Sequence, residues 1–241
     1  MAPDPSLADR LAFVRSAVAD AVRDAGRRES EVTTIVVTKF HPASLVRELA
    51  ALGVSDVGEN RQQEASEKAS ELADLDLRWH FIGQLQSKKA KSVLSFASAI
   101  HSLDRLSLVT ALGNALSAGN ALSAGNALST GGAIDAFIQL NLTDDAARGG
   151  VRPADLERFA ESVIAIDGIR LRGVMAVAPI DGHPREAFAR VRESGERLQT
   201  LAPDATDLSM GMSGDFRAAI LEGATHLRIG TAITGNRPPA G

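Results

Sequence analysis

The chain has 241 residues, of which 44% are hydrophobic and 23% are charged, the balance of an ordinary globular protein. It contains no cysteine, which excludes disulfides, thiolate metal sites and cysteine nucleophiles, and it contains no tyrosine. The net charge of −4 lacks the basic excess of a nucleic-acid binder, and no apolar run approaches the roughly 20 residues that cross a bilayer. The N-terminus lacks a secretory signal pattern, so we expect a cytoplasmic protein with no nucleic-acid or membrane partner.

Helical and strand-like segments alternate along the chain. Residues 6–26 predict an N-terminal amphipathic helix, with Ser6 and Asp9 as a capping pair. Short apolar segments then predict eight strands, at residues 33–38, 54–57, 79–82, 99–103, 134–142, 171–177, 207–210 and 226–229. Helices are predicted at residues 43–52, 60–72, 87–96, from 104 onward, and at 153–166, 184–201 and 215–222.

Eight β-α units in this length favour a closed, TIM-like (β/α)8 barrel over an open doubly wound sheet. We expect one domain over residues 1–241, with the N-terminal helix as an addition to the barrel. Functional side chains in such barrels lie where strands end and β-α loops begin. The residues just after each predicted strand are therefore the candidates for a site.

A hexapeptide repeat interrupts this pattern at residues 113–130, where Gly-Asn-Ala-Leu-Ser-Ala occurs twice and Gly-Asn-Ala-Leu-Ser-Thr once. A six-residue period matches neither a helix nor a strand, and each interior glycine costs a helix about 1 kcal/mol relative to alanine. We interpret the repeat as an expanded, largely flexible helix-to-strand connection with no role in the site. The alternative is that it prolongs the preceding helix.

Lys39 ends the most apolar strand. At a barrel mouth, partial desolvation would favour the neutral amine, which is the form that makes a Schiff base. The alternative is a solvated lysine at a strand end.

The last strand is followed by Gly230 and Thr231, whose N–H and hydroxyl groups could bind a phosphate, since barrels often do so near strands 7 and 8. The alternative is a plain glycine turn. Ser213, after the preceding strand, could complete the cradle. A nucleophile elbow there is disfavoured, because Asp215 stands where that motif needs its second glycine and only His226 could complete the triad.

Two further polar residues lie on or after early strands. Asn60 could hydrogen-bond a ligand or cap the helix that it begins, and His80 lies in an apolar strand, where a packed or hydrogen-bonded histidine is the commoner outcome. The five histidines show no metal-binding spacing, and neither a P-loop nor a Gly-x-Gly-x-x-Gly motif occurs. We therefore expect no metal site.

A strand-end lysine, a late phosphate cradle and Arg228 on the last strand together suggest pyridoxal 5′-phosphate. The chain resembles the pyridoxal phosphate homeostasis protein family, whose fold is the alanine racemase N-terminal barrel. The matching stretches, in the family's order, are Val37-Thr38-Lys39 with Pro42, Gly58-Glu59-Asn60, Trp79-His80-Phe81-Ile82-Gly83 with Leu85-Gln86, Ser209-Met210-Gly211-Met212-Ser213 with Asp215, and Arg228-Ile229-Gly230-Thr231-Ala232-Ile233.

The resemblance implies a role for each matching position. Lys39 would carry the cofactor as an internal aldimine, and Arg228 would face the pyridine nitrogen. The phosphate would be held by Ser213, Gly230 and Thr231. Asn60 would lie near the polar edge of the ring, and His80 and Met212 would line the pocket.

The resemblance also implies a function: a monomer that binds pyridoxal phosphate for intracellular vitamin B6 homeostasis, without established catalysis, and that could serve pyridoxal phosphate-dependent apo-enzymes. An arginine at the pyridine nitrogen only donates hydrogen bonds, which weakens the electron sink of the cofactor. Racemases with this barrel use a tyrosine from a second domain as the other acid–base group. The absence of tyrosine excludes that two-base mechanism within this chain.

Two other functions stay open: an amino-acid racemase or decarboxylase using the same lysine, and a barrel for a different phosphorylated ligand. The chain departs from the family pattern at Thr234, where phenylalanine is usual, at Lys88, where asparagine is usual, and in the hexapeptide repeat. None of these departures affects Lys39 or the expected phosphate cradle.

Overall fold

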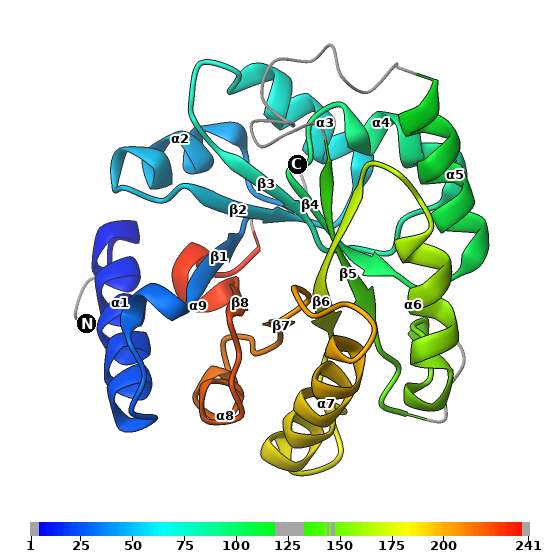
Figure 1. Cartoon of the computed structure of the whole chain (residues 1–241). Coiled ribbons are helices and arrows are strands. Elements are labelled where there is room, and N and C mark those ends of the chain that lie inside the picture. The colour runs from blue at the N-terminus through cyan, green and yellow to red at the C-terminus, as the bar shows by residue number, and fades with distance from the viewer. Residues whose placement is uncertain (1–4, 119–132, 144, 146–147, 238–241) are drawn as a thin grey trace.

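Eight parallel strands close into a barrel in the computed structural model, which describes residues 5–118, 133–143, 145 and 148–237 (Figure 1). Each strand pairs with the next in the chain, and β8 closes the barrel on β1, with Ile229 opposite Val36. The strands are β1 Thr33–Val37, β2 Asp56–Glu59, β3 Arg78–Phe81, β4 Ala99–Leu103, β5 Ile134–Gln139, β6 Ile169–Met175, β7 Asp207–Ser209 and β8 His226–Ile229. This confirms the predicted fold.

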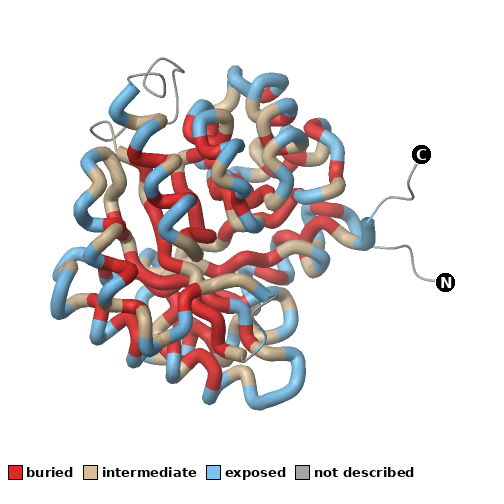
Figure 2. Tube along the Cα trace, turned by 90° about the vertical axis from the view of Figure 1, so that its right-hand side faces the viewer, coloured by how far each residue is buried: buried red, intermediate tan, exposed pale blue. Residues whose placement is uncertain are grey.

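Helices surround the barrel on its outside (Figure 1). They are α1 Leu7–Asp24, α2 Ala43–Ala51, α3 Gln62–Glu71, α4 Ala90–Leu94, α5 Leu106–Ser117, α6 Leu156–Ile164, α7 Pro184–Gln199, α8 Phe216–Leu221 and α9 Thr231–Thr234. Short 3-10 turns are η1 Glu29–Glu31, η2 Ser87–Lys89 and η4 Pro153–Asp155. The buried strands lie inside, and the outer faces of the helices are exposed (Figure 2).

The N-terminal helix α1 begins as predicted, with a capping box. The Ser6 hydroxyl accepts the N–H of Asp9, and the Asp9 carboxylate accepts the N–H of Ser6, so each residue satisfies an end group of the other. The apolar face of α1 is buried, and Arg10 Nε donates to the carbonyl of Ile233 in α9 at 2.7 Å. The extra helix is thereby attached to the last helix of the barrel.

Several strand boundaries differ from the prediction by one to three residues, and at one of them an apolar residue belongs to a helix end. Strand β2 begins at Asp56 rather than at residue 54. Gly53 has φ +80, the N–H of Gly53 donates to Ala50, and the N–H of Val54 donates to Leu49. These bonds are the Schellman motif, in which the residue after the glycine packs back on the helix. Val54 is therefore a capping residue of α2.

The hexapeptide repeat begins inside helix α5. Residues 113–117 continue that helix, as the alternative interpretation expected, and Gly113 is buried against Ile166. An added Cβ at Gly113 would lie 3.0 Å from the Ile166 side chain. Residues 119–132 lie outside the described part of the chain, so the expectation of flexibility there stays a prediction.

Part of the barrel interior is polar, in contrast to the apolar layer between strands and helices. Barrel interiors usually hold branched apolar side chains. Here His80, His101, Ser209 and Arg228 are buried inside, each at most 6% exposed. Buried polar groups need hydrogen-bond partners to be tolerated, so this interior must be an organised network.

Candidate functional site

Lys39 lies two residues beyond the end of β1, at the carboxyl end of the barrel. Its side chain is exposed, with Nζ 5.8 Å from the centre of the Phe40 ring, so the structure does not show the partial desolvation expected from the sequence. Gly230 follows the neighbouring strand β8, and an added Cβ at Gly230 would lie 3.5 Å from Val37. The predicted amine and the predicted phosphate cradle therefore lie on adjacent strand ends.

The residue after Lys39 has an uncommon backbone conformation. Phe40 has φ +70, and it is the only non-glycine residue with positive φ in the described part of the chain. Two arginines lie against its ring, with Cζ of Arg61 at 4.9 Å and Cζ of Arg237 at 4.2 Å from the ring centre. Three cations, including Lys39, therefore gather around one aromatic ring at the barrel mouth.

A buried ionic cluster holds the backbone on both sides of Lys39. Nζ of Lys68 donates to the carbonyl of Thr38 at 2.9 Å and to the carboxylates of Glu59 and Glu64 at 2.6 and 2.7 Å. Glu64 in turn accepts the N–H of Phe40 at 2.5 Å. Because Thr38 and Phe40 flank Lys39, this cluster fixes the segment that carries the amine.

Two oxygens, one in this cluster and one on the residue that follows Glu59, have no hydrogen-bond partner among the described residues. They are Oε2 of Glu59 and Oδ1 of Asn60, and both are buried. Burial raises the pKa of the Glu59 carboxyl, although hydrogen bonds from Lys68 and Thr38 act in the opposite direction. Buried polar atoms without partners are rare in folded proteins and point to a ligand or an ordered water.

The backbone of Asn60 lies directly against Gly83, which follows the next strand, β3. An added Cβ at Gly83, after β3, would lie 2.1 Å from the carbonyl oxygen of Asn60, so only glycine fits there. The side chain of Asn60 makes no hydrogen bond that would cap α3, whose first residue is Gln62. The capping interpretation is therefore not supported, and the amide oxygen is available to a ligand.

The expected phosphate cradle is formed by two loops. The hydroxyl of Ser213 lies 3.5 Å from the N–H of Ala232, which joins the loop after β7 to the start of α9. The N–H groups of Ser213, Gly214, Gly230 and Thr231 have no acceptor within the part of the chain that the structure describes. Four unpaired donors on adjoining loops suit an anion.

Met212 and Asp215 shape the loop after β7. The Asp215 carboxylate accepts the N–H of Met212 at 2.6 Å, and the carbonyl of Met212 accepts the N–H of Asp215. Asp215 therefore stabilises a turn, and this contact does not support the interpretation of the loop as a nucleophile elbow. The side chain of Met212 is 37% exposed, at the rim of the mouth.

Arg228 points into the barrel from β8. Nη1 donates to the Ser209 hydroxyl and Nη2 to the carbonyl of Ala176, both at 2.8 Å. Burial lowers the pKa of Arg228 to about 10, so the guanidinium stays protonated at neutral pH. Because Ala176 and Ser209 lie at the carboxyl ends of β6 and β7, Arg228 is held directly beneath the loops of the cradle.

His80 lies deeper in the barrel than the other predicted residues. Its ring nitrogens contact Asp56 at 2.9 Å and His101 at 3.0 Å, and its side chain lines a cavity of about 460 Å³ at the amino ends of the strands. The structure therefore brings His80 together with Asp56 and His101. No pattern in the sequence indicated that these three side chains meet, beyond the tendency of a histidine in an apolar strand to be hydrogen-bonded.

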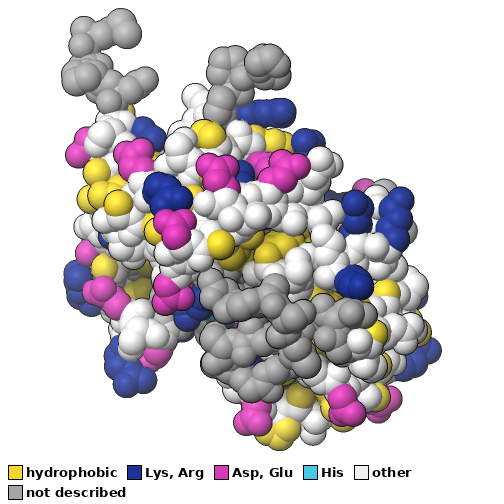
Figure 3. Space-filling model, turned by 90° about the horizontal axis from the view of Figure 1, so that it is seen from above, with side chains coloured by type: hydrophobic (Ala, Val, Ile, Leu, Met, Phe, Trp, Pro, Cys, Tyr) yellow, Lys and Arg dark blue, Asp and Glu magenta, His cyan; other side chains and the backbone are white. Residues whose placement is uncertain are grey.

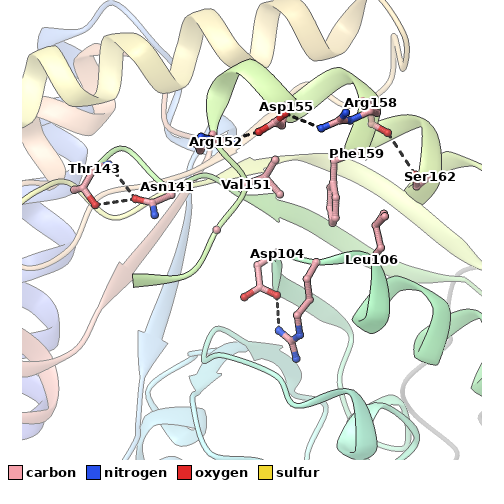
Figure 4. Close-up of a pocket in the computed structure, with 12 residues that line it drawn as sticks. Asp104, Leu106, Asn141, Thr143, Val151, Arg152, Asp155, Arg158, Phe159 and Ser162 are labelled. Carbon is pink, nitrogen blue, oxygen red and sulfur yellow. Dashed lines mark hydrogen bonds and ion pairs between the residues drawn. The ribbon is translucent and has the colours of Figure 1, made fainter. Parts of the chain in front are cut away.

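A second cavity, of about 550 Å³, opens beside the barrel mouth between the loops after β4 and β5 (Figure 4). Its polar groups are largely paired with one another: Asp104 with Arg105 at 2.5 Å, and Asp155 with both Arg152 and Arg158. Leu106, Val151 and Phe159 supply its apolar wall. Lys39 does not line it, so this cavity is separate from the predicted site.

The described part of the chain has neither a metal-binding cluster nor a membrane-spanning helix. Within the described residues, no three histidine or acidic side chains are grouped so that they could hold a metal ion. None of the described helices combines the length and the apolar character needed to cross a membrane.

The chain is similar to known proteins over nearly its whole length. The family model of the alanine racemase N-terminal domain matches residues 15–238. A pyridoxal phosphate homeostasis protein of Pseudomonas aeruginosa is 39% identical over 235 residues, covering 96% of each chain. One of Mycobacterium leprae is 37% identical over 244 residues, covering 96% of this chain and 93% of the relative.

Solved structures show the same similarity. PipY of Synechococcus elongatus, solved with pyridoxal phosphate bound, has a TM-score of 0.80 and 35% identity, covering 95% of this chain and 100% of PipY. Alanine racemase of Corynebacterium glutamicum shares the fold, with a TM-score of 0.64 and 14% identity, and the match covers 94% of this chain and 62% of the racemase.

Proposed function

This chain belongs to the alanine racemase N-terminal domain family and, within it, to the pyridoxal phosphate homeostasis proteins, and on this basis we propose that it binds pyridoxal 5′-phosphate at the carboxyl end of its barrel. The observation that carries the proposal is the placement of Lys39 next to a loop pair with four unpaired N–H donors. When bound, the cofactor supplies an aldehyde that condenses with a primary amine.

The charge of the mouth suits a phosphorylated ligand. Lys39, Arg61 and Arg237 surround Phe40, and such a group of cations raises the local concentration of a phosphate dianion. Gly230 and Thr231, with Ser213, would hold the phosphate through N–H and hydroxyl groups. An aromatic ring placed between these loops and Lys39 would also cover the lysine from water.

The remaining polar groups suit the ring of the cofactor. Arg228 has N–H donors beyond the two that bind Ser209 and Ala176, and it would direct one of them to the pyridine nitrogen. The unpartnered Oδ1 of Asn60 would accept a hydrogen bond at the polar edge of the ring. Met212 would border the ring at the rim, whereas His80 would act only from the interior.

We propose that the protein holds the cofactor without turning over amino acids. Arg228 can only donate hydrogen bonds, so it would keep the pyridine nitrogen a hydrogen-bond acceptor, and this would weaken the electron sink that carbanion chemistry needs. The chain also has no tyrosine to serve as a second acid–base group. Incubation of the loaded protein with alanine in deuterated water should give α-proton exchange no faster than free cofactor gives. Faster exchange would overturn this part of the proposal.

The binding site is tested by covalent trapping. The full chain is loaded with pyridoxal phosphate, reduced with borohydride and digested, and the mass of each lysine peptide is measured. We expect the label on Lys39, no label in Lys39→Ala, and unchanged labelling in Lys89→Ala, which removes another exposed lysine. Labelling spread evenly over the lysines would overturn the assignment, and an unmodified Lys39 would favour a different phosphorylated ligand.

We further propose that the protein acts in the cytoplasm as a single-domain monomer that passes its cofactor to pyridoxal phosphate-dependent apo-enzymes. On the described part of the face that Figure 3 shows, charged side chains of both signs are interspersed with small hydrophobic groups, which does not favour permanent association through that face. Transfer is tested by adding loaded protein to an apo-enzyme. We expect activity to return faster than the spontaneous release of cofactor allows, and recovery limited by release would count against transfer.

A further inference from the structure

A continuous hydrogen-bonded chain of side chains crosses the barrel interior from Asp56 to Arg228. Nε2 of His80 lies 2.9 Å from Asp56, Nδ1 of His80 lies 3.0 Å from Nε2 of His101, Nδ1 of His101 lies 2.8 Å from the Ser209 hydroxyl, and Nη1 of Arg228 lies 2.8 Å from that hydroxyl. The five residues come from β2, β3, β4, β7 and β8. All are at most 6% exposed, so water does not replace their contacts.

When both imidazoles are neutral, the chemistry of the two ends sets the direction of every proton in this row of hydrogen bonds. Arg228 can only donate, and an ionised Asp56 can only accept. With both imidazoles neutral, one assignment satisfies all four contacts. Arg228 donates to Ser209, the Ser209 hydroxyl donates to Nδ1 of His101, Nε2–H of His101 donates to Nδ1 of His80, and Nε2–H of His80 donates to Asp56.

The surroundings favour an ionised Asp56 and a neutral His101. Burial alone would raise the pKa of Asp56, but hydrogen bonds from His80 and Arg78 outweigh it and hold that pKa below its ordinary value. Burial, with the positive charges nearby, places the pKa of His101 well below its ordinary value. His226 faces both imidazoles, and burial lowers its pKa to about 4, so it adds no charge at neutral pH.

The other neighbours of the chain are fixed. The Phe137 ring is stacked on His101, with centres 4.3 Å apart and planes at 12°. Arg172 is paired with Asp207 at 2.7 Å and so does not compete for Asp56. The network is therefore enclosed at His101, Ser209 and Arg228, and it ends at the Asp56 carboxylate, which also pairs with Arg78 at 2.6 Å beside the cavity at the amino ends of the strands.

Arg228 needs such a chain because it has no close counter-ion. Among the described residues no carboxylate lies within ion-pair distance of its guanidinium, although the group is buried. Removing a cation from water is costly unless its hydrogen bonds are satisfied and its charge is offset. A row of aligned N–H and O–H dipoles that ends in a carboxylate provides both, since each hydrogen bond polarises the next.

We propose that Asp56, His80, His101 and Ser209 are positioning residues for Arg228, holding its guanidinium in the one orientation that presents its remaining donors to the pyridine ring. The role of this network in binding rests on the proposed function. The fixed tautomers and the fixed guanidinium do not, because they are properties of the protein without cofactor. The two can therefore be tested separately.

The protein offers a matched control variant for each end of the hydrogen-bonded network. Ser209→Ala removes the link next to Arg228, and its control is Ser102→Ala, which removes an equally buried hydroxyl that has no partner among the described residues. Asp56→Asn removes the terminal charge, and its control is Asp207→Asn, which alters a buried carboxylate outside the network. If one network variant does not fold, the other still provides the test.

The first measurement uses cofactor-free protein labelled with ¹⁵N. Nitrogen shifts should show His80 and His101 as neutral Nε2–H tautomers near neutral pH, and the Arg228 guanidinium should exchange its protons slowly. In Ser209→Ala we expect this exchange to become about tenfold faster or more, because a hydrogen bond to a charged group is lost. Ser102→Ala should leave it unchanged. A protonated or Nδ1–H His101, or an Arg228 equally protected in Ser209→Ala, would overturn the inference.

The second measurement is the dissociation constant of pyridoxal phosphate, from equilibrium dialysis with the full chain. Ser209→Ala should raise it about tenfold, Asp56→Asn should raise it in the same direction, and both controls should leave it unchanged. Equal binding by Ser209→Ala and Ser102→Ala would overturn the positioning role. If the unaltered protein does not bind the cofactor, the proposed function fails. The histidine tautomers and the proton exchange of Arg228 still show, in that case, whether the hydrogen-bonded network holds the guanidinium.

Discussion

Replacing Lys68 by methionine should cost the fold much more than a lysine substitution usually does. The side chains of Lys68 and Glu59 are 7% and 1% exposed and their charged atoms are 2.6 Å apart. Lys68→Met keeps most of the side-chain volume but leaves Glu59 buried without its counter-ion. Removing one partner of a buried ion pair costs about 3–5 kcal/mol, whereas an exposed pair contributes about 0–1 kcal/mol.

The loss should depend on pH in one direction. Burial already raises the pKa of Glu59 above its ordinary value, and without Lys68 it rises further. A carboxyl whose pKa is raised by folding is tolerated below its unfolded pKa and destabilises the fold as pH rises through the folded pKa. The deficit of Lys68→Met should therefore be small near pH 4 and grow toward neutrality.

The assay is urea unfolding of Lys68→Met, with two comparison variants. Lys91→Met removes an exposed lysine on the neighbouring helix α4 and should change the free energy of unfolding by less than about 0.5 kcal/mol. The double variant Glu59→Gln/Lys68→Met removes both charges and should recover part of the loss. A cost below about 1 kcal/mol at pH 7, or a deficit that grows on acidification, would refute the argument.

Three further predictions concern the site and the N-terminal helix. Gly83→Ala places a Cβ 2.1 Å from the Asn60 carbonyl and should cost about 1–3 kcal/mol in thermal unfolding and weaken cofactor binding; an unchanged melting temperature would contradict the close approach. Ser6→Ala breaks the capping box of α1 and should cost about 1 kcal/mol in the same assay, whereas no loss would mean that the cap does not contribute. Lys39→Ala removes an exposed side chain and should change the free energy of unfolding by less than about 0.5 kcal/mol while abolishing covalent trapping; a larger loss would show that the lysine is structural.

The fold could be read from the sequence because its signals are local. The run Thr33–Val37 and the segment His226–Ile229 are short and apolar, and amphipathic stretches separate such strands at regular intervals. The capping pair at Ser6 was likewise visible in sequence. The start of β2 after Val54 could not be read in this way, because it required knowing that Val54 packs on a helix end, which alternation of apolar residues does not reveal.

The candidate site could be read only in part. Lys39 and Gly230 were found because each lies within two residues of a strand end, and parallel strands end at the same rim. Lys68 and Glu64 lie on α3, where their spacing suggested only a polar helix surface. Their role arises because that helix packs over Thr38 and Phe40, a contact between segments about 25 residues apart.

Sequence alone determined the barrel, the family and the strand-end residues, because the period and order of the elements carry that information along the chain. Tertiary structure alone decided which polar groups meet inside the barrel. His80, His101 and Ser209 are unremarkable in their own strands and become one network only when closure brings β3, β4 and β7 around a common axis. A residue's hydrogen-bond partners inside a barrel depend on register and tilt across several strands, and these are properties of the closed sheet.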